Sequence, residues 1–199
     1  MKIEIEKRGP ISQKEKERLV QFLTKKGALI KKTEQLAIFC ETDDINDSKK
    51  TVSLNLLKDT STGDFDCTLK AKLGAWGKHA RKEITFPFSE ADFESVIGFM
   101  EVLGITRACP RFYLRSDYAY DIYKFSIKEE GLLEDHFEIE TEIEKDEGTD
   151  RIEDEILVLL TKLQLTLFDD TYYKNEIIRI YNENPPVELT SIRLDKYFR

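Results

Sequence analysis

The chain has 199 residues, a length typical of one domain. Apolar residues make up 40% of it and charged residues 35%, which leaves enough Leu, Ile, Val and Phe for a core beside an unusually charged remainder. The formal net charge of −8 argues against general nucleic-acid binding, because nothing neutralises a phosphate backbone in bulk, although it permits a locally positive site.

In the first half of the chain, alternating residues predict strands and helical spacing predicts helices. A strand over Met1–Arg8 is followed by a helix between its cap Ser12 and Gly27. Ser89 opens a second helix, which Gly104 closes. Four strands are expected between these helices, with a hairpin at 59–63: Gln35–Glu41, Thr51–Leu57, Phe65–Lys72 and Arg81–Phe86.

The second half of the chain continues with three strands, with a hairpin connection at 116–121: Arg111–Arg115, Ile122–Lys128 and Phe137–Ile143. A third helix opens at Asp150 and carries its Ile and Leu residues on one stripe. A fourth helix opens at Asp170 and ends before Pro185 and Pro186. We therefore assign residues 1–184 to one domain and leave 185–199 as a tail whose role the pattern does not predict.

Several features predict a protein of the cytoplasm. The first ten residues, MKIEIEKRGP, are charged where a secretion signal needs an apolar stretch, and no apolar run has membrane length. The cysteines Cys40, Cys67 and Cys109 lack metal-type spacing, so we expect buried, reduced thiols. The isolated His79 and His136 are expected at the surface, and Trp76 in a hairpin turn.

About eight strands in sequence-local hairpins with four helices predict an α+β fold with an antiparallel sheet. Alternate residues of a strand point to opposite faces, so one face of this sheet is apolar and the other is charged. Its carboxylates concentrate on the first and last strands, with cations between them. We predict a closed eight-stranded antiparallel β-barrel with a charged lumen and helices outside, because closure removes unprotected edges. The alternative is an open sheet whose charged face is solvated.

A lumen with charges of both signs suits a ligand that combines a polyanion with a metal ion. Buried charges are costly unless they are paired, hydrated or bound to a ligand. Lys and Arg hold phosphate oxygens, and the two carboxylates of a Glu-x-Glu strand suit Mg²⁺ or Mn²⁺. No nucleophile is obvious, so direct attack of water is the natural mechanism.

These residues resemble the CYTH superfamily of triphosphate tunnel metalloenzymes, which includes class IV adenylate cyclases, thiamine triphosphatases and inorganic triphosphatases. The family hallmark Glu-x-Glu-x-Lys is similar to Glu4-Ile5-Glu6-Lys7-Arg8, with arginine in place of lysine. A Lys-bearing strand, an Arg-x-Glu strand, an Arg-rich strand and a late Glu-x-Glu strand follow in the family order: Thr68–Lys72, Arg81–Glu83, Arg111–Arg115 and Glu138–Glu140.

The resemblance implies roles for these residues and Mg²⁺ or Mn²⁺ as the cofactor. Glu4 and Glu6 would be catalytic. The metal ligands would be Glu4, Glu6, Glu83, Glu138 and Glu140. The substrate-binding residues would be Arg8, Lys70, Lys72, Arg81, Arg111, Arg115 and Lys124.

Two features depart from the family pattern. The strand that usually carries Arg-x-Arg to grip phosphates has Ser53 and Asn55 instead. The metal-binding aspartate that usually precedes the late Glu-x-Glu has no clear match, and Lys128 stands near its place. Both departures bear on how strongly the site could hold a triphosphate and a metal.

The expected function is metal-dependent hydrolysis of an inorganic or organic triphosphate inside the tunnel. An alternative is a catalytically weak module of the same fold that binds a phosphate or polyphosphate ligand. A third is a class IV-type adenylate cyclase. The expected partner is a small-molecule triphosphate or polyphosphate, with no nucleic acid and no membrane, and the chain is expected as a monomer or homodimer.

Overall fold

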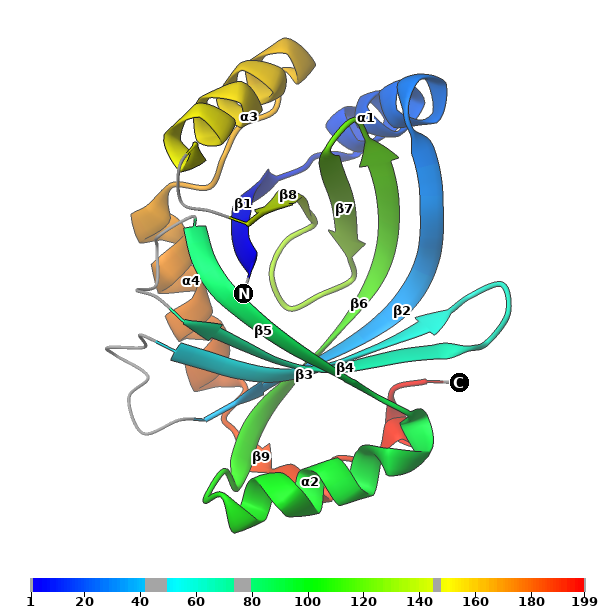
Figure 1. Cartoon of the computed structure of the whole chain (residues 1–199), viewed down its shortest axis with the longest axis vertical. Coiled ribbons are helices and arrows are strands. Elements are labelled where there is room, and N and C mark those ends of the chain that lie inside the picture. The colour runs from blue at the N-terminus through cyan, green and yellow to red at the C-terminus, as the bar shows by residue number, and fades with distance from the viewer. Residues whose placement is uncertain (1, 42–49, 74–79, 145–147, 199) are drawn as a thin grey trace.

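The computed structural model describes residues 2–41, 50–73, 80–144 and 148–198, which form nine strands and four α-helices (Figure 1). The strands are β1 (Lys2–Pro10), β2 (Ala28–Cys40), β3 (Lys50–Asp59), β4 (Phe65–Leu73), β5 (Ala80–Phe88), β6 (Arg107–Tyr120), β7 (Tyr123–Glu129), β8 (His136–Ile143) and β9 (Val187–Glu188). The helices are α1 (Gln13–Lys26), α2 (Phe93–Val102), α3 (Thr149–Leu163) and α4 (Asp170–Glu183).

Eight of the strands close into an antiparallel barrel, as predicted. Their order is β2-β3-β4-β5-β1-β8-β7-β6, and pairing between β6 and β2 completes the ring. The short β9 pairs with β6 outside the ring. Each of the eight strands therefore pairs with a neighbour on both sides, which fits the prediction that the charged sheet would not be left open.

The two closing strands are longer than the sequence predicted. β2 begins at Ala28 rather than Gln35, and β6 extends to Tyr120, so the hairpin connection expected at 116–121 is present but shortened to Asp121 and Ile122. The segment Ala28–Lys32 lacks apolar-polar alternation, and Leu29 and Ile30 are half exposed. Pairing between two strands distant in sequence extended both of them, and local pattern cannot show such pairing.

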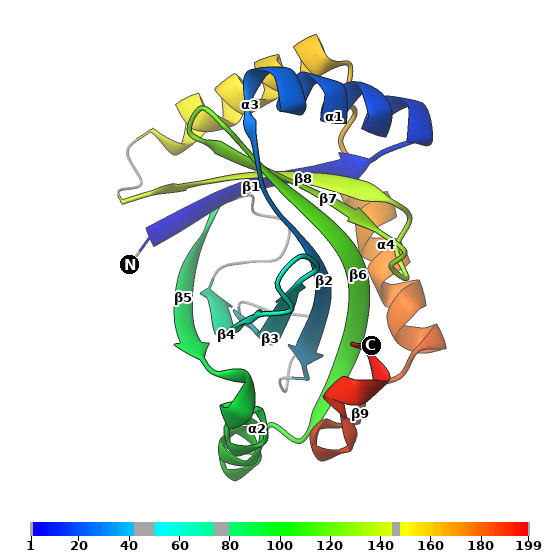
Figure 2. The ribbon, with the colours of Figure 1, turned by 90° about the vertical axis from the view of Figure 1, so that its right-hand side faces the viewer.

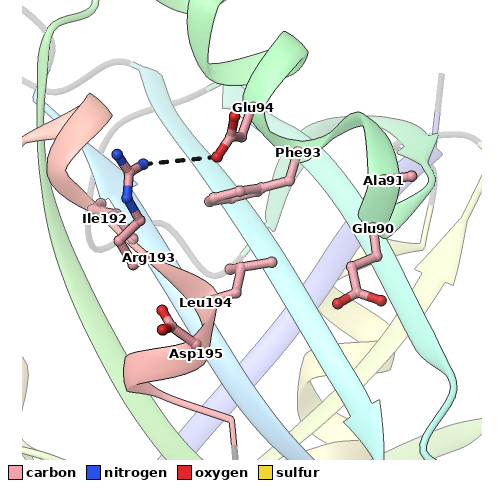
Figure 3. A pocket seen from close by; sticks show the side chains of 8 residues that line it. All are labelled: Glu90, Ala91, Phe93, Glu94, Ile192, Arg193, Leu194 and Asp195. Atoms are coloured by element: carbon pink, nitrogen blue, oxygen red, sulfur yellow. Dashed lines mark ion pairs between the residues drawn. The ribbon is translucent and has the colours of Figure 1, made fainter.

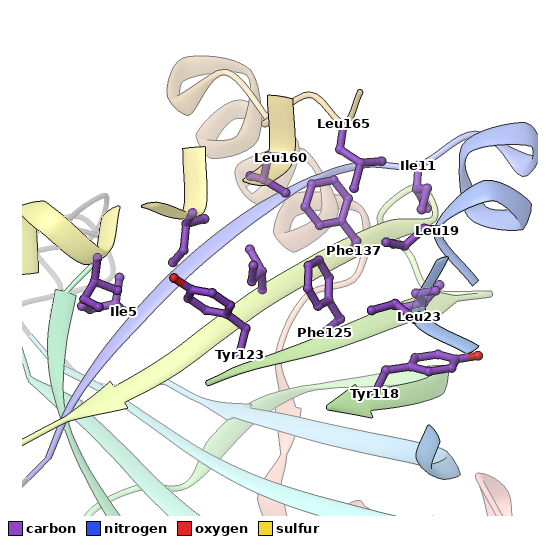
Figure 4. Close-up of a cluster of buried hydrophobic side chains, with 14 residues drawn as sticks. Ile5, Ile11, Leu19, Leu23, Tyr118, Tyr123, Phe125, Phe137, Leu160 and Leu165 are labelled. Atoms are coloured by element: carbon purple, nitrogen blue, oxygen red, sulfur yellow. The ribbon is translucent and has the colours of Figure 1, made fainter. Parts of the chain in front are cut away.

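Helices α1 and α3 cover the outer face of one wall of the barrel, made of β1, β8 and β7 (Figure 2). The first apolar cluster fills the space between them, with Ile5, Phe125, Phe137 and Ile139 from the strands (Figure 4). The helices contribute mainly Leu and Ile side chains: Leu19, Leu23, Ile152, Ile156 and Leu160. Burying these stripes against the sheet is the main reason that the amphipathic helices form where the spacing predicted.

Helix α2 and the C-terminal segment cover the outer face of the opposite wall, made of β2, β3 and part of β4. The second apolar cluster joins strand residues such as Leu36 and Leu56 to Phe93 and Ile97 of α2. The tail that the sequence left unplaced joins this cluster through buried apolar residues: Leu189, Ile192 and Phe198. Residues 187–198 therefore pack on the barrel as part of its core.

Capping interactions and backbone conformations are found at several of the expected helix boundaries. Ser12 and Glu15 form a reciprocal capping box at the start of α1. Asp169, one residue before the expected Asp170, caps α4 by accepting a hydrogen bond from the backbone N–H of Tyr172. Gly104 follows α2 with φ of 83°, a left-handed conformation that favours glycine.

The cysteines are free thiols, with Cys67 and Cys109 buried and Cys40 partly buried. Burial raises the pKa of the Cys40 thiol to about 12. In the part of the chain described, no helix is both long and apolar enough to pass through a membrane.

Candidate active site in the barrel lumen

The alternate strand residues that carry charge face the inside of the barrel. On β1 and β8, Glu6 lies opposite Glu140 and Arg8 opposite Glu138. Their odd-numbered neighbours Ile5 and Ile139 belong to the apolar cluster outside. The charged lumen predicted from alternation is therefore confirmed, and Glu4, Glu6 and Glu138 are all buried in it.

Three carboxylates converge on one point of the lumen. Ligand oxygens of Glu4, Glu6 and Glu140 all lie within 4.8 Å of one another. The ammonium of Lys72, from β4, contacts Glu4 directly and lies 3.2 Å from Oε2 of Glu6. The same Nζ is 3.5 Å from Oε2 of Glu83. A lysine from β4, two strands away from β1 in the barrel, thus offsets part of the charge of these acidic groups.

The pKa values of Glu4 and Glu6 move in opposite directions although both contact Lys72. Burial, and then repulsion from Glu6, raises the pKa of Glu4 to about 7. Burial would also raise the pKa of Glu6, but Arg8 and Lys72 outweigh it and lower that pKa to about 2. The difference arises because Arg8 is paired with Glu6 and not with Glu4. Each carboxylate of the cluster has a cationic partner, and burial is the first cause of the raised pKa of Glu4.

This donor set fits a divalent cation. The oxygens are hard ligands of the kind that Mg²⁺ and Mn²⁺ prefer. Burial and the neighbouring carboxylates raise the pKa of Glu4, and a divalent ion bound there would oppose that rise. Oε2 of the nearby Glu83 is also buried and accepts no hydrogen bond from the described residues. Glu4, Glu6 and Glu140 are thus the residues that could hold a metal.

Glu138 lies in a different environment from the other predicted metal ligands. Lys128 pairs with it at 2.6 Å, and Arg8 and His136 lie 4.0 and 3.9 Å away. Burial opposes ionisation of Glu138, but Lys128 and Arg8 hold its pKa well below the usual range. The structure therefore places Glu138 among cations and outside the three-carboxylate cluster.

The remaining predicted cations also face the lumen, and most have an acidic partner. Lys70 pairs with Glu83 at 2.7 Å, and Lys124 pairs with Glu140. Arg115 pairs with Asp117 at 2.7 Å. Arg111 instead lies over the ring of Phe39, 4.9 Å from its centroid. Arg81 lies opposite Glu4 in the backbone register, but its side chain is outside the described part, as are Trp76 and His79.

Sequence reasoning missed several residues of the lumen. The surface position expected for His136 was wrong: it is buried, because it shares the inward parity of Glu138 at the start of β8. Asp117 and Ser126 hydrogen-bond each other and Arg115 deep in the lumen. Asp117 was missed because it fell in the expected hairpin. Its alternation with Arg115 would have indicated that both side chains face the lumen.

An aromatic group closes around Arg8 at one end of the barrel. Arg8 donates a hydrogen bond to the hydroxyl of Tyr173 on α4, and its guanidinium lies 5.0 Å from the centre of the same ring. Phe168 contacts both Tyr173 and His136. No local pattern in α4 indicated this contact, because it joins residues 165 positions apart.

The wall of the lumen formed by β2 and β3 is uncharged over the inward residues between Thr33 and Phe39 and between Ser53 and Leu57. Gln35 accepts a hydrogen bond from Arg115 at 3.2 Å and donates one to Asn55 at 3.2 Å. Asn55 in turn donates to Ser53 at 3.0 Å. The two residues that replace the expected arginines are therefore the end of a hydrogen-bonded chain that begins on the charged side.

A separate pocket of about 390 Å³ lies outside the barrel, between the start of α2 and the C-terminal segment (Figure 3). Phe93 and Leu194 form its apolar floor, and Glu94 and Arg193 face each other at 3.8 Å across it. Both charged side chains are more than half exposed. This pocket is remote from the carboxylate cluster and shares none of the predicted site residues.

Comparison with known proteins supports the fold. No family model and no curated protein matches the sequence. Among solved structures, the chain is similar to the PH1819 protein from Pyrococcus horikoshii OT3, with a TM-score of 0.74 and 18% identity over 88% of this chain and 98% of that one.

Two other similar structures have names that refer to an activity. A candidate adenylate cyclase from Vibrio parahaemolyticus matches with a TM-score of 0.65 and 13% identity, over 86% of this chain and 96% of that one. HpAC1 from Hippeastrum, a candidate adenylyl cyclase described as having a dominant triphosphatase activity, matches with a TM-score of 0.57 and 14% identity, over 84% and 90%. The predicted resemblance to CYTH-type proteins is thus confirmed at the level of the fold.

Proposed function

We propose that this protein is a metal-dependent hydrolase of a triphosphate-containing compound. The observation that carries the proposal is the convergence of Glu4, Glu6 and Glu140 in an enclosed lumen that also holds lysines and arginines. An acidic cluster suits a cation, and the basic groups suit phosphate oxygens. The names of similar structures point to the same chemistry.

Glu4, Glu6 and Glu140 would hold Mg²⁺ or Mn²⁺. The ion would neutralise charge on the phosphate chain and favour attack by water. Glu83 can accept a hydrogen bond from that water, because its Oε2 has no hydrogen-bond partner in the described lumen. Glu138 would serve instead to hold Lys128 and Arg8 in place.

The phosphate oxygens would bind the lumenal cations. Arg111 is the best placed of them, because the guanidinium is buried and its Nε donates no hydrogen bond to a described residue. Lys70 and Lys124 are partly exposed within the lumen, so they can turn from their carboxylates towards a substrate. Such preorganised charges supply most of the catalysis in phosphoryl transfer.

Phosphate release tests the proposal. Tripolyphosphate, thiamine triphosphate and ATP should be assayed at high enzyme concentration with Mg²⁺ and with Mn²⁺. We expect turnover of at least one of them, and Glu6→Gln should lower it at least ~100-fold because it removes a charged ligand. The exposed Glu94→Gln is the matched control and should have no effect. Lack of turnover with all three compounds and both metals would contradict the proposal.

A binding module without turnover is the second candidate, and Lys72 favours it. Its ammonium already lies among Glu4, Glu6 and Glu83, where it competes with a metal ion. In that case the wild-type protein should bind tripolyphosphate with an affinity that Mn²⁺ does not change. Formation of cyclic AMP from ATP would instead indicate the third candidate, a cyclase.

A further inference from the structure

The uncharged wall of the lumen comprises the inward side chains of 33–39 on β2 and 53–57 on β3, together with Thr68 of the adjoining β4. Backbone register places its members side by side: Phe39 lies opposite Ser53, and Asn55 lies opposite Thr68. Lys70, opposite Ser53, marks the point where the wall becomes charged. The apolar core on this side of the barrel is formed by the outer faces of the same strands, with Leu36, Ile38, Leu54 and Leu56. Core formation therefore does not explain why the inner face lacks charge.

Buried polar atoms without a partner gather on and beside this wall. Oγ1 of Thr33, Oγ1 of Thr68 and Nε of Arg111 are all buried and make no hydrogen bond to a described residue. Arg111 of β6 and Thr68 of β4 lie in one row across the strands, because Arg111 is opposite Ala37, Ala37 is opposite Asn55, and Asn55 is opposite Thr68. Thr33 lies four residues further along β2. Leaving a buried polar atom unpaired is costly, so the atoms of Thr68 and Arg111 in this row point to a ligand that hydrogen-bonds with them.

An aromatic ring is also available on the wall. Phe39 keeps 38% of its surface exposed although it faces the lumen, and Arg111 stacks on it. A ring and a guanidinium plane in contact form a platform on which a flat organic group can lie. One end of this platform is the charged guanidinium of Arg111. A ligand can therefore place its organic part on Phe39 and a phosphate against Arg111.

Inorganic tripolyphosphate does not match this wall. All the terminal oxygens of that ion share its negative charge and bind best to cations, whereas Ser53, Asn55 and Thr68 offer only neutral donors. Most cations of the described lumen are already paired with carboxylates on the other side. The hydroxyls, the amide and the ring are the groups that recognise a neutral, hydrogen-bonding and partly flat molecule.

We infer that the uncharged wall binds the organic part of the substrate, so that the preferred substrate is an organic ester of triphosphate and not inorganic tripolyphosphate. The inference rests on the proposed function for the phosphate end of the site. It assigns Phe39, Thr33 and Thr68 to substrate selection, and Arg111 to the junction between the two parts of the substrate.

Calorimetric titration in the presence of Mn²⁺ tests the inference with two probes, the β,γ-methylene analogue of ATP and inorganic tripolyphosphate. Both contain three linked phosphorus atoms, so they differ mainly in the organic part. We expect the ATP analogue to bind at least ~10-fold more tightly, the ratio that one good hydrogen bond or stacking contact provides.

Two double variants test the role of the uncharged wall. Phe39→Ala with Thr68→Val should weaken binding of the ATP analogue ~10-fold and leave tripolyphosphate within ~2-fold. Ser53→Arg with Asn55→Arg should reverse the preference by strengthening tripolyphosphate binding ~10-fold. Thr190→Val, at an exposed position of the C-terminal segment, is the matched control. Thermal unfolding of each variant shows whether it is folded.

The outcomes distinguish this inference from the proposed function. Equal affinity for the two probes, tighter binding of tripolyphosphate, or equal effects of Phe39→Ala with Thr68→Val on both probes would overturn the inference and leave the phosphate site intact. If neither probe binds to folded wild-type protein, the proposed function fails and the inference fails with it. If the second double variant does not fold, the wild-type preference and the first variant still decide.

Discussion

The two walls of the barrel have similar outer faces and different inner ones. The charged wall, made of β1, β8 and β7, presents Glu6, Glu138 and Lys128 to the lumen. The uncharged wall, made of β2 and β3, presents Gln35, Ser53 and Asn55. Outside, each wall buries a continuous layer of Leu, Ile and Phe. The outer faces are thus what the fold requires, while the inner faces are free to carry the chemistry.

The outer layers should therefore matter most for stability, and the largest effect is expected from removing residues 187–199. This truncation deletes Leu189, Ile192 and Phe198 from the second apolar cluster and exposes the outer face of the uncharged wall. We expect a loss of about 5 kcal/mol or more, enough to unfold a typical domain. Circular dichroism on heating measures it, and a stable, cooperative truncated protein would contradict it.

Phe125→Ala tests the outer face of the charged wall. Phe125 is fully buried in the first apolar cluster, and the resulting cavity should cost about 3–5 kcal/mol of unfolding free energy in urea titration. Leu56→Ala is the matching change behind the uncharged wall and should cost about 2–5 kcal/mol. A cost below 1 kcal/mol for only one of them would mean that the outer layers are not equivalent.

Inside the charged wall, Lys128→Met should destabilise the protein by about 3 kcal/mol at neutral pH. The change removes the closest partner of the buried Glu138 and leaves its charge with more distant cations. Lys124→Met is the control, because Lys124 and its partner Glu140 are more exposed, and should cost less than about 1 kcal/mol. Equal costs in urea titration would show that burial of the pair is unimportant.

The stability of the fold should also depend on pH, through His136 in the charged wall. Burial, together with Lys128, lowers the pKa of His136 to about 4, below its ordinary value of 6.5. The unfolded chain therefore binds a proton first as pH falls, and this contribution to stability is complete above pH 6.5 and is lost between pH 6.5 and 4.

Urea titrations across that pH range measure the effect, with a slope of at most about 1.4 kcal/mol per pH unit from this residue. His136→Gln should remove this part of the slope. An unchanged slope in the variant would show that His136 is not the group that titrates.

The smallest effect is expected on the uncharged wall. Ser53→Ala removes one neutral hydrogen bond, that donated by Asn55 at 3.0 Å, and should change the unfolding free energy by less than about 1 kcal/mol. Because this wall is inferred to bind the substrate, Ser53→Ala should change the free energy of binding of the ATP analogue more than it changes the free energy of unfolding. A larger loss of stability than with Lys128→Met would reverse the comparison between the walls.

Much of the barrel could be predicted because alternation is a local property. Ile5 and Glu6 are neighbours that must point to opposite faces, so the sequence showed which residues share a face before any strand was paired. The antiparallel barrel and the charged lumen followed from that pattern. The lengths of β2 and β6 did not, because the segment near Leu29 lacks alternation and depends on a partner strand far along the chain.

The sequence by itself determined the strands, the capped helices and the set of charged residues on one parity, since these depend on neighbours within a few positions. Only the tertiary structure decided that Lys72 meets Glu4 and Glu6, that Glu138 is surrounded by cations, and that His136 is buried. Those contacts join side chains from different strands across the lumen. Their geometry depends on how the sheet closes, a long-range property that residue spacing along one strand does not contain.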